Sequence, residues 1–268
     1  MTVSVLGCGW YGSELAKTLV NKWIKVKGST TSAEKLAVLS QLGIEPYQIN
    51  LATDDTIDTD FLECDVLWIS IPPKARSGNG KVYLDSLTKL IPQIKSQAVK
   101  QVVLISSTGV YSDNNTEVTE LDAPSPDTES GKILLAAEEL LKAEKGFTTT
   151  IIRFGGLIGP GRDPGRFFAG KKAIPNGDAP VNLIHLTDCI GISSAILDKQ
   201  AFGYTYNAVS PLHPPKGEFY TAAALASALE EPQFIEEKNN WKIVSSVNVP
   251  KYLEYEYKHG LMPTITSS

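Results

Sequence analysis

The feature that most constrains the fold is a glycine-rich turn near the start of the chain, where Gly7, Gly9 and Gly12 follow a short apolar run. Residues 3–6 have strand character, and the segment after Gly12 carries leucines at helical spacing. Strand, glycine turn and helix in this order make the G-x-G-x-x-G spacing typical of dinucleotide binding. The glycines would allow a tight turn, a close approach of a pyrophosphate, and close packing of helix on strand. The alternative is a turn that is rich in glycine for packing alone.

The second half of this unit is polar where a carboxylate is expected. Residues 24–28 predict the next strand, and an acid near its end, about 20 residues on, would hold the ribose hydroxyls of NAD. Instead, the strand runs into the hydroxyl side chains of Ser29, Thr30, Thr31 and Ser32, and the first acid is Glu34. Hydroxyls beside Lys35 suit a 2′-phosphate, which favours NADP over NAD as the cofactor. The alternative is a polar loop in which Ser32 caps a helix and Lys35 is solvated.

Composition excludes several classes of partner. The 268 residues are 42% hydrophobic and 21% charged, which suits a globular chain with a sizeable core. A net charge of −5 without any basic run argues against nucleic acid or an anionic membrane as a partner. The cysteines and histidines lack metal-site or C-x-x-C spacing, so we expect no metal and reduced thiols in the cytoplasm. Cys8, inside the glycine turn, is either a reactive thiol or buried filler.

Strand and helix patterns alternate through the first 155 residues or so. Near-continuous apolar strands, such as residues 64–73 and 101–107, predict an α/β fold with a Rossmann-type, doubly wound parallel sheet covered on both faces. Residues 148–159 predict one further strand, and Pro92 predicts a kink or break in a helix over 83–96. We predict a dinucleotide-binding domain over 1–158 and a smaller substrate-binding part over 159–268. A strand and a helix near 182–208 are expected to return to the first domain.

Several segments together resemble the extended short-chain dehydrogenase/reductase superfamily, the NAD(P)-dependent epimerases and dehydratases. They are GCGWYG at the start, ISSTGVYS at 105–112, GKILLAAEELL at 131–141, RFGGLIGPGR at 153–162 and IHLTD at 184–188. The resemblance implies cofactor contacts across the chain. In addition to the three glycines and Ser29, Thr30 and Thr31, these contacts are Trp10, Tyr11, Asn50, Leu51, Ser70, Ile71, Pro72, Ser106, Gly155 and Leu157. By resemblance, Asn50 and Leu51 match the position that contacts adenine, and residues 70–72 match the loop under the nicotinamide ribose.

The catalytic positions depart from the pattern of that family. By resemblance, Thr108 supplies a hydroxyl to the substrate, with Tyr111 close by. The family's acid/base is a tyrosine in Y-x-x-x-K, whose pKa the lysine lowers towards neutrality. Aligning the helix puts Ser130 and Leu134 at these two positions, so the resemblance implies a branch without the usual pair, with Thr108 or Tyr111 as the catalytic candidates.

Two arginines suggest the substrate's charge. Arg162 and Arg166 match a region that often touches substrate in the resembled family, and arginine binds carboxylate or phosphate well. These side chains therefore either hold an anionic substrate or are solvated arginines of a loop.

Two functions follow from these observations. The first is an NADP-preferring oxidoreductase or epimerase acting on a small carbonyl or sugar-like substrate. The second is a non-catalytic NAD(P)-binding sensor or scaffold protein, motivated by the missing tyrosine and lysine. The sequence leaves a homodimer open.

Overall fold

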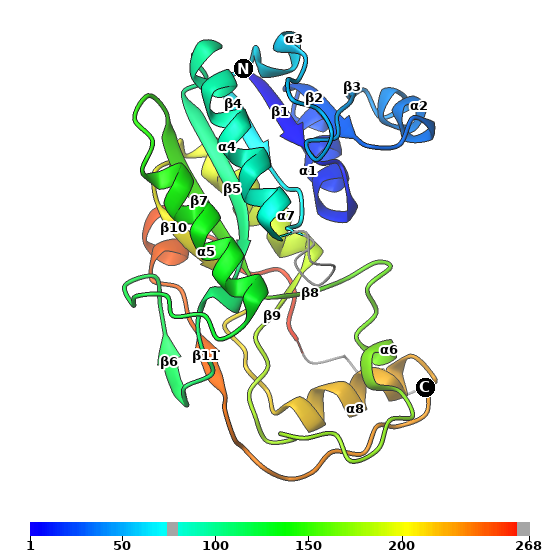
Figure 1. Cartoon of the computed structure of the whole chain (residues 1–268). Helices are drawn as coiled ribbons and strands as arrows, with labels where there is room; N and C mark the ends of the chain where they lie inside the picture. Colours follow the sequence, from blue (N-terminus) through cyan, green and yellow to red (C-terminus); the bar gives the residue numbers. More distant parts are fainter. Residues whose placement is uncertain (74–79, 262–268) are drawn as a thin grey trace.

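The described part of the chain, residues 1–73 and 80–261 of the computed structural model, is built around a seven-stranded sheet (Figure 1). The strand order is β10-β7-β5-β4-β1-β2-β3, and every neighbouring pair is parallel. The strands are β1 Thr2–Leu6, β2 Lys25–Thr30, β3 Glu45–Gln48, β4 Val66–Ile69, β5 Gln101–Ser107, β7 Thr148–Phe154 and β10 Thr205–Ala208. The predicted doubly wound, Rossmann-type sheet is confirmed.

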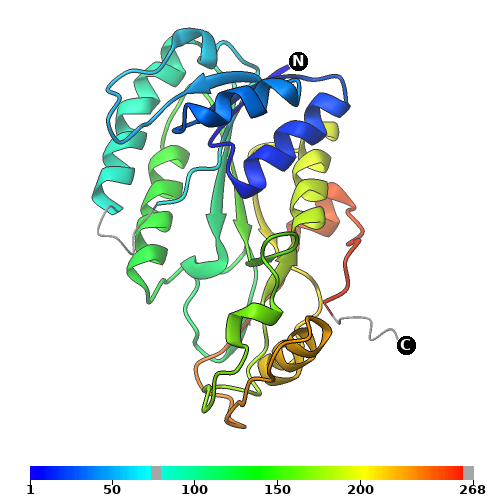
Figure 2. The same cartoon turned by 90° about the vertical axis from the view of Figure 1, so that its right-hand side faces the viewer.

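Helices cover both faces of this sheet. Figure 2 shows α4 and α5 on one side of the sheet and α1 and α7 on the other. The helices of this region are α1 Trp10–Asn21, α2 Glu34–Gln41, α3 Thr59–Leu62, α4 Gly80–Ser96, α5 Glu129–Lys142 and α7 Leu186–Asp198. Because both faces are covered, all four residues of β4 are buried, and this explains their unbroken apolar sequence.

The chain reverses its direction across the sheet next to β1. The strands β2 and β3 lie on one side of β1, whereas β4 and β5 lie on the other. Leu6 and Ile69 are register partners at the ends of β1 and β4, so the glycine turn and the loop after β4 leave the sheet side by side. A ligand crevice is expected at such a switch point, outside the carboxyl ends of the strands.

Smaller elements lie below the carboxyl edge of the main sheet (Figure 1). The strand β8, Gly156–Ile158, pairs with β9, Leu183–His185, and β6, Thr116–Val118, pairs with β11, Lys242–Val244. Two helices, α6 Gly165–Phe168 and α8 Lys216–Ala226, and two short turns, η2 Thr108–Val110 and η3 Val249–Leu253, complete the described chain. Near residues 182–208, α7 packs on α1 and β10 joins the main sheet, whereas β9 pairs with β8.

The prediction of one strand over residues 148–159 is wrong, because the chain changes partners at Gly155. The Gly155 N–H donates to the Ala208 oxygen at 3.1 Å, whereas the Gly156 N–H donates to the Asn182 oxygen at 2.8 Å. A Cβ at Gly155 would lie 2.8 Å from that Asn182 oxygen, so the change of sheet requires a glycine here. Of the kink or break predicted at Pro92, the break is wrong: α4 runs through Pro92, which lies on its exposed side.

A buried ion pair joins α5 to β7. Arg153 donates from Nε to Glu138 Oε1 at 3.0 Å and from Nη2 to Glu138 Oε2 at 2.6 Å. The Glu138 side chain is 1% exposed and that of Arg153 is 4% exposed. Ser106 donates its hydroxyl to Glu138 Oε1 at 2.6 Å, and Arg153 Nη1 donates to the Tyr111 hydroxyl at 2.6 Å. This network fixes the carboxyl end of β5, and the sequence analysis singled out neither Glu138 nor Arg153.

Removing either partner should destabilise the fold strongly, because the other charge is then left buried and unpaired. We expect Glu138→Ala or Arg153→Ala to lower the free energy of unfolding by about 3–5 kcal/mol. The matched control is Glu139→Ala on the exposed side of α5, for which we expect a change within about 0.5 kcal/mol. Urea unfolding followed by circular dichroism measures these differences. Equal stabilities of the Glu138 and Glu139 variants would contradict the conclusion that Glu138 belongs to a buried ion pair.

Candidate cofactor site at the glycine turn

The glycine turn is held by hydroxyl groups from the ends of two neighbouring strands. The Gly7 N–H donates to Ser29 Oγ at 2.9 Å, and Ser70 Oγ donates to the Gly7 oxygen at 2.7 Å. The Cys8 N–H donates to the Ser29 carbonyl oxygen at 2.7 Å. Ser29 and Ser70, both predicted cofactor residues, therefore also fix the shape of the turn after β1.

The three glycines of the turn do different physical work. Gly7 adopts a φ of +104°, which side chains rarely tolerate. A Cβ at Gly12 would lie 2.2 Å from the Gly7 oxygen, so α1 packs directly on the turn only because residue 12 is glycine. A Cβ at Gly9 would meet no atom within 4 Å. Gly9 therefore borders open space, at a helix N-terminus that no side chain caps.

This open position is suited to an anion. The first N–H groups of α1 point out of the helix and carry the positive end of its dipole. A phosphate group approaching Gly9 would accept from these groups without displacing any side chain. The arrangement is the one that the G-x-G-x-x-G spacing predicts, and it fits the pyrophosphate of a dinucleotide.

Cys8 does not have the surroundings of a reactive thiol. Its side chain is buried, and this burial raises the pKa of the thiol to about 12. The group stays protonated near neutral pH, which favours the interpretation as buried filler.

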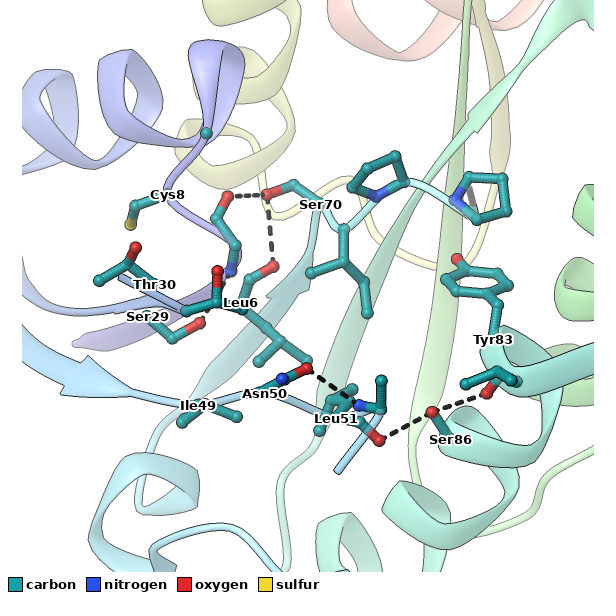
Figure 3. A pocket seen from close by; sticks show the side chains of 18 of the residues that line it. Leu6, Cys8, Ser29, Thr30, Ile49, Asn50, Leu51, Ser70, Tyr83 and Ser86 are labelled. Carbon is teal, nitrogen blue, oxygen red and sulfur yellow. Dashed lines mark hydrogen bonds between the residues drawn. The ribbon is translucent and has the colours of Figure 1, made fainter. Parts of the chain in front are cut away.

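A cavity of about 520 Å³ opens beside the turn. Figure 3 shows Ser29 and Thr30 on one side of it and Tyr83 and Ser86 of α4 on the other. The structure brings ten of the predicted cofactor residues together in its lining: Gly7, Gly9, Ser29, Thr30, Thr31, Asn50, Leu51, Ser70, Ile71 and Pro72. The size is in the range of small-molecule sites, and the two halves of the lining come from opposite sides of the switch point.

The sequence analysis missed the wall that α4 contributes. Val82, Tyr83 and Ser86 line the cavity from the first turns of this helix. Ser86 donates its hydroxyl to the oxygens of Leu51 and Val82, at 2.8 and 2.7 Å. The sequence did hold one signal for this wall. The helix α4 is the next element after β4, which lies beside β1 at the switch point, so its first turns could be expected near the cavity.

The charge of the lining bears on cofactor preference. Among the described lining residues, none is a carboxylate, and Lys35 is the one with a cationic side chain. The helix α2 begins after Ala33, so the alternative in which Ser32 is its N-cap is wrong. The Ser32 hydroxyl bonds instead to Glu34, and the Thr30 hydroxyl accepts from the Ser32 N–H at 3.2 Å.

Five other predicted cofactor residues do not line the cavity and make contacts elsewhere, through their side chains or through close packing. The Tyr11 hydroxyl bonds to Ser193 of α7 at 2.6 Å, so this side chain joins two helices. Ser106 donates to Glu138, as described above. The remaining three are Trp10, Gly12 and Gly155, of which the glycines serve close packing. Leu157, also predicted, lies in β8 and packs against the core.

Trp10 connects the glycine turn to Arg162. Its indole Nε1 donates to the Pro160 oxygen at 2.6 Å. The Arg162 guanidinium lies 4.4 Å from the centre of a Trp10 ring, within cation–π distance. Arg166 behaves differently, since its side chain is 79% exposed and its Nε lies 3.7 Å from Asp163. The structure thus places Arg162 at the glycine turn and Arg166 in solvent.

The predicted catalytic residues gather where β5 meets α5. Thr108 is buried at the start of η2. A Cβ at Gly131 would lie 2.2 Å from the Gly109 oxygen, so the first turn of α5, which contains Ser130, packs closely against η2. Leu134 is buried one turn further along, and the sequence of α5 contains no tyrosine.

Tyr111 lies in the buried network and not in the cavity. Its hydroxyl lies 2.9 Å from the Thr119 oxygen and 3.1 Å from Asn207 Oδ1, and it accepts from Arg153 at 2.6 Å. Burial raises the pKa of this phenol, against the opposing effect of the Arg153 charge. A hydroxyl engaged with three partners inside the protein is poorly placed to exchange a proton with a substrate.

A second cavity, of about 640 Å³, lies between α6, α8 and the chain near residue 260. His185 and His259 stack at its edge with ring centres 3.6 Å apart. Within the described residues, the structure has no cluster of side chains suited to a metal ion. Among the same residues, no helix is both long enough and apolar enough to span a membrane.

Comparisons with known proteins give the family. Residues 7–185 match the family model described as NAD(P)H-binding. Protein YeeZ of Escherichia coli (strain K12) is 34% identical over 264 residues, which cover 96% of each chain. A 3-diazoavenalumate denitrifying reductase from Streptomyces sp is 27% identical over 146 residues, 49% of this chain and 48% of that protein. UDP-glucuronic acid 4-epimerase from Bacillus cereus, solved with UDP-glucuronic acid and NAD, has a TM-score of 0.78 at 17% identity, with 97% of this chain and 95% of that one covered.

The chain therefore belongs to the NAD(P)H-binding family. Its fold is that of the short-chain dehydrogenase/reductase epimerases, as the resemblance implied. It is an NAD(P)-binding protein of this type.

The glycine turn gives a matched pair of variants. Gly12→Ala should destabilise the protein by about 2–4 kcal/mol, because the added methyl group overlaps the Gly7 oxygen and displaces α1. Gly9→Ala should leave the free energy of unfolding within about 1 kcal/mol of wild type, because its methyl group enters open space. Thermal and urea unfolding of both variants measure this. A Gly9 variant as unstable as the Gly12 variant would mean that Gly9 serves packing alone.

Proposed function

We propose that the chain is an NAD(P)-dependent oxidoreductase or epimerase that acts on a small carbonyl or sugar-like substrate. The observation that carries the proposal is the open position at Gly9, which joins an uncapped helix N-terminus to a cavity of about 520 Å³ at the switch point of the sheet. The names of two similar proteins, a reductase and an epimerase, support a reaction of this kind.

NADP is the cofactor form that the lining favours. A 2′-phosphate adds negative charge at the adenosine ribose, and the side chains expected there are Thr30, Thr31 and Lys35. Without a carboxylate among the described lining residues, no like charge opposes this phosphate. The epimerase from Bacillus cereus was solved with NAD, so the preference is proposed from the residues of this chain alone.

Thr108 is the hydroxyl that we propose for the substrate. A nicotinamide bound in the site would supply or accept the hydride. The Thr108 side chain lies at the carboxyl end of β5, next to the first turn of α5, where the resemblance expects the substrate. A threonine hydroxyl there would donate to, or accept from, a substrate oxygen and so orient it.

Tyr111 and the arginines take different parts in this proposal. We assign Tyr111 to positioning, because its hydroxyl holds Arg153 and the strand end together. Arg162 stacks on Trp10 at the start of α1. We therefore propose that its guanidinium faces a negatively charged group of the bound dinucleotide or of the substrate. We leave Arg166 out of the site because it is solvated beside Asp163.

A second function is favoured by α5. Its sequence contains no tyrosine, and Leu134 is buried where the resemblance expects a lysine. A site without an acid/base pair would bind the dinucleotide and not turn it over. In that case the chain is a sensor of the cofactor's oxidation state or a scaffold for another molecule.

The cofactor preference predicts a charge effect at Lys35. We expect wild type to bind NADPH about tenfold more tightly than NADH, and Lys35→Ala to bring the two affinities within about twofold. Lys17 is a solvated lysine on α1. Its variant Lys17→Ala is the control and should keep the preference for NADPH over NADH. Isothermal titration calorimetry with NADPH and NADH measures the two affinities of each protein. Tighter binding of NADH by wild type would contradict the NADP assignment.

The proposed reaction predicts a separation of binding from turnover. Purified protein with NADPH, tested against a panel of carbonyl compounds and nucleotide sugars, should oxidise the cofactor or epimerise a sugar. Thr108→Val should lower kcat/KM by about tenfold to a hundredfold with unchanged NADPH affinity, because one hydrogen bond to the substrate is lost. Arg166→Ala should behave as wild type. Saturable NADPH binding without any turnover would favour the sensor or scaffold instead.

A further inference from the structure

One buried side chain of the cofactor cavity has no partner. Tyr83 lies in the first turns of α4 and is 5% exposed. Within the described structure its hydroxyl makes no hydrogen bond, although the atom is shielded from solvent. Tyr83 nevertheless lines the cavity of about 520 Å³, on the wall opposite Ser29 and Thr30 (Figure 3).

Three other buried phenols of the described chain have hydrogen-bond partners within the protein. The hydroxyl of Tyr11 bonds to Ser193, that of Tyr206 donates to the Ala201 oxygen at 2.7 Å, and that of Tyr111 has three partners. Ser86, one turn after Tyr83, is also satisfied within the protein. A buried hydroxyl without a partner costs stability, so its presence at the edge of a ligand cavity calls for a physical reason.

The direction of the hydroxyl supplies that reason. In Figure 3, the Tyr83 ring points away from Ser86 and towards the side of the cavity on which Ser70 lies. Leu51, which accepts from Ser86, belongs to the half expected to hold adenine. The Tyr83 hydroxyl is therefore directed from the adenine half towards the loop expected to lie under the nicotinamide ribose.

We propose that the Tyr83 hydroxyl binds the dinucleotide directly, by donating a hydrogen bond to a phosphate or ribose oxygen of its nicotinamide-side half. The inference rests on the proposed function, because it requires a dinucleotide in this cavity. Burial raises the pKa of the phenol, so the group keeps its proton and acts as a donor over the working range of pH. No other partner is needed, since the missing acceptor is the ligand itself.

The proposal makes stability and affinity change in opposite directions. Removing the hydroxyl from the free protein removes an unsatisfied polar group, so Tyr83→Phe should raise or preserve the melting temperature. Removing it from the complex deletes a hydrogen bond, so the same variant should bind NADPH about threefold to tenfold more weakly. A purely structural role for Tyr83 would not combine an unchanged or higher melting temperature with a loss of affinity.

Thermal unfolding without ligand and calorimetric titration with NADPH test this on wild type, Tyr83→Phe and Tyr206→Phe. The Tyr206 control removes a phenol bonded within the protein, so it should lower the melting temperature and leave NADPH affinity unchanged. Equal NADPH affinity of wild type and Tyr83→Phe would overturn the inference and leave the proposed function standing. Absence of dinucleotide binding by wild type would overturn both, and the two failures are thus told apart. The melting temperature of the variant reports its folding in the same experiment.

Discussion

The close approach of α1 to the turn that precedes it is the constraint on which the site depends. Residue 12 has no room for a Cβ, because the Gly7 oxygen would lie 2.2 Å away. That same oxygen accepts from Ser70 at the end of β4, and the Gly7 N–H donates to Ser29 at the end of β2. One short turn therefore sets the distance between three strands and a helix, and it leaves the helix N-terminus open at Gly9.

A second set of contacts fixes the end of β5, next to the hydroxyl that we propose for the substrate. The buried pair of Glu138 and Arg153 fixes Ser106 and Tyr111, and so fixes the end of β5 at which Thr108 lies. Because the Ser106 hydroxyl donates its hydrogen bond to Glu138, its oxygen can only accept from a ligand. The network also reaches the C-terminal part: Asn207, which bonds to Tyr111, donates to the Ser245 oxygen. The two parts of the chain are thus tied together directly behind the proposed substrate position.

The sequence predicted the fold well where local pattern and tertiary environment agree. Buried parallel strands such as β4 are apolar throughout, and the glycine spacing has a single structural setting, so both were readable. The strand over residues 148–159 was predicted as continuous because the change of sheet partner at Gly155 depends on Asn182 and Ala208, which are distant in sequence. The break considered at Pro92 does not occur, and Pro92 lies on the side of α4 that meets solvent.

The candidate site was predictable only in part, for the same reason. Residues on the turn and at the strand ends could be identified from their positions in sequence motifs. Tyr83 and Ser86 belong to no motif, and they line the cavity only because of the way α4 packs. Glu138 and Arg153 lie fifteen positions apart, and only the fold shows that these charges are buried together. The side-chain partners of Tyr111 likewise come from three separate segments.

A crystal structure of the full chain grown with NADPH would test the central claim most directly. We predict density for the dinucleotide along the cavity, with its pyrophosphate over Gly9 at the N-terminus of α1 and its 2′-phosphate beside Lys35. Adenine is expected against Leu51, and a ligand oxygen within hydrogen-bond distance of the Tyr83 hydroxyl. A dinucleotide bound elsewhere on the chain, or a pyrophosphate that does not touch the turn at Gly9, would contradict the assignment.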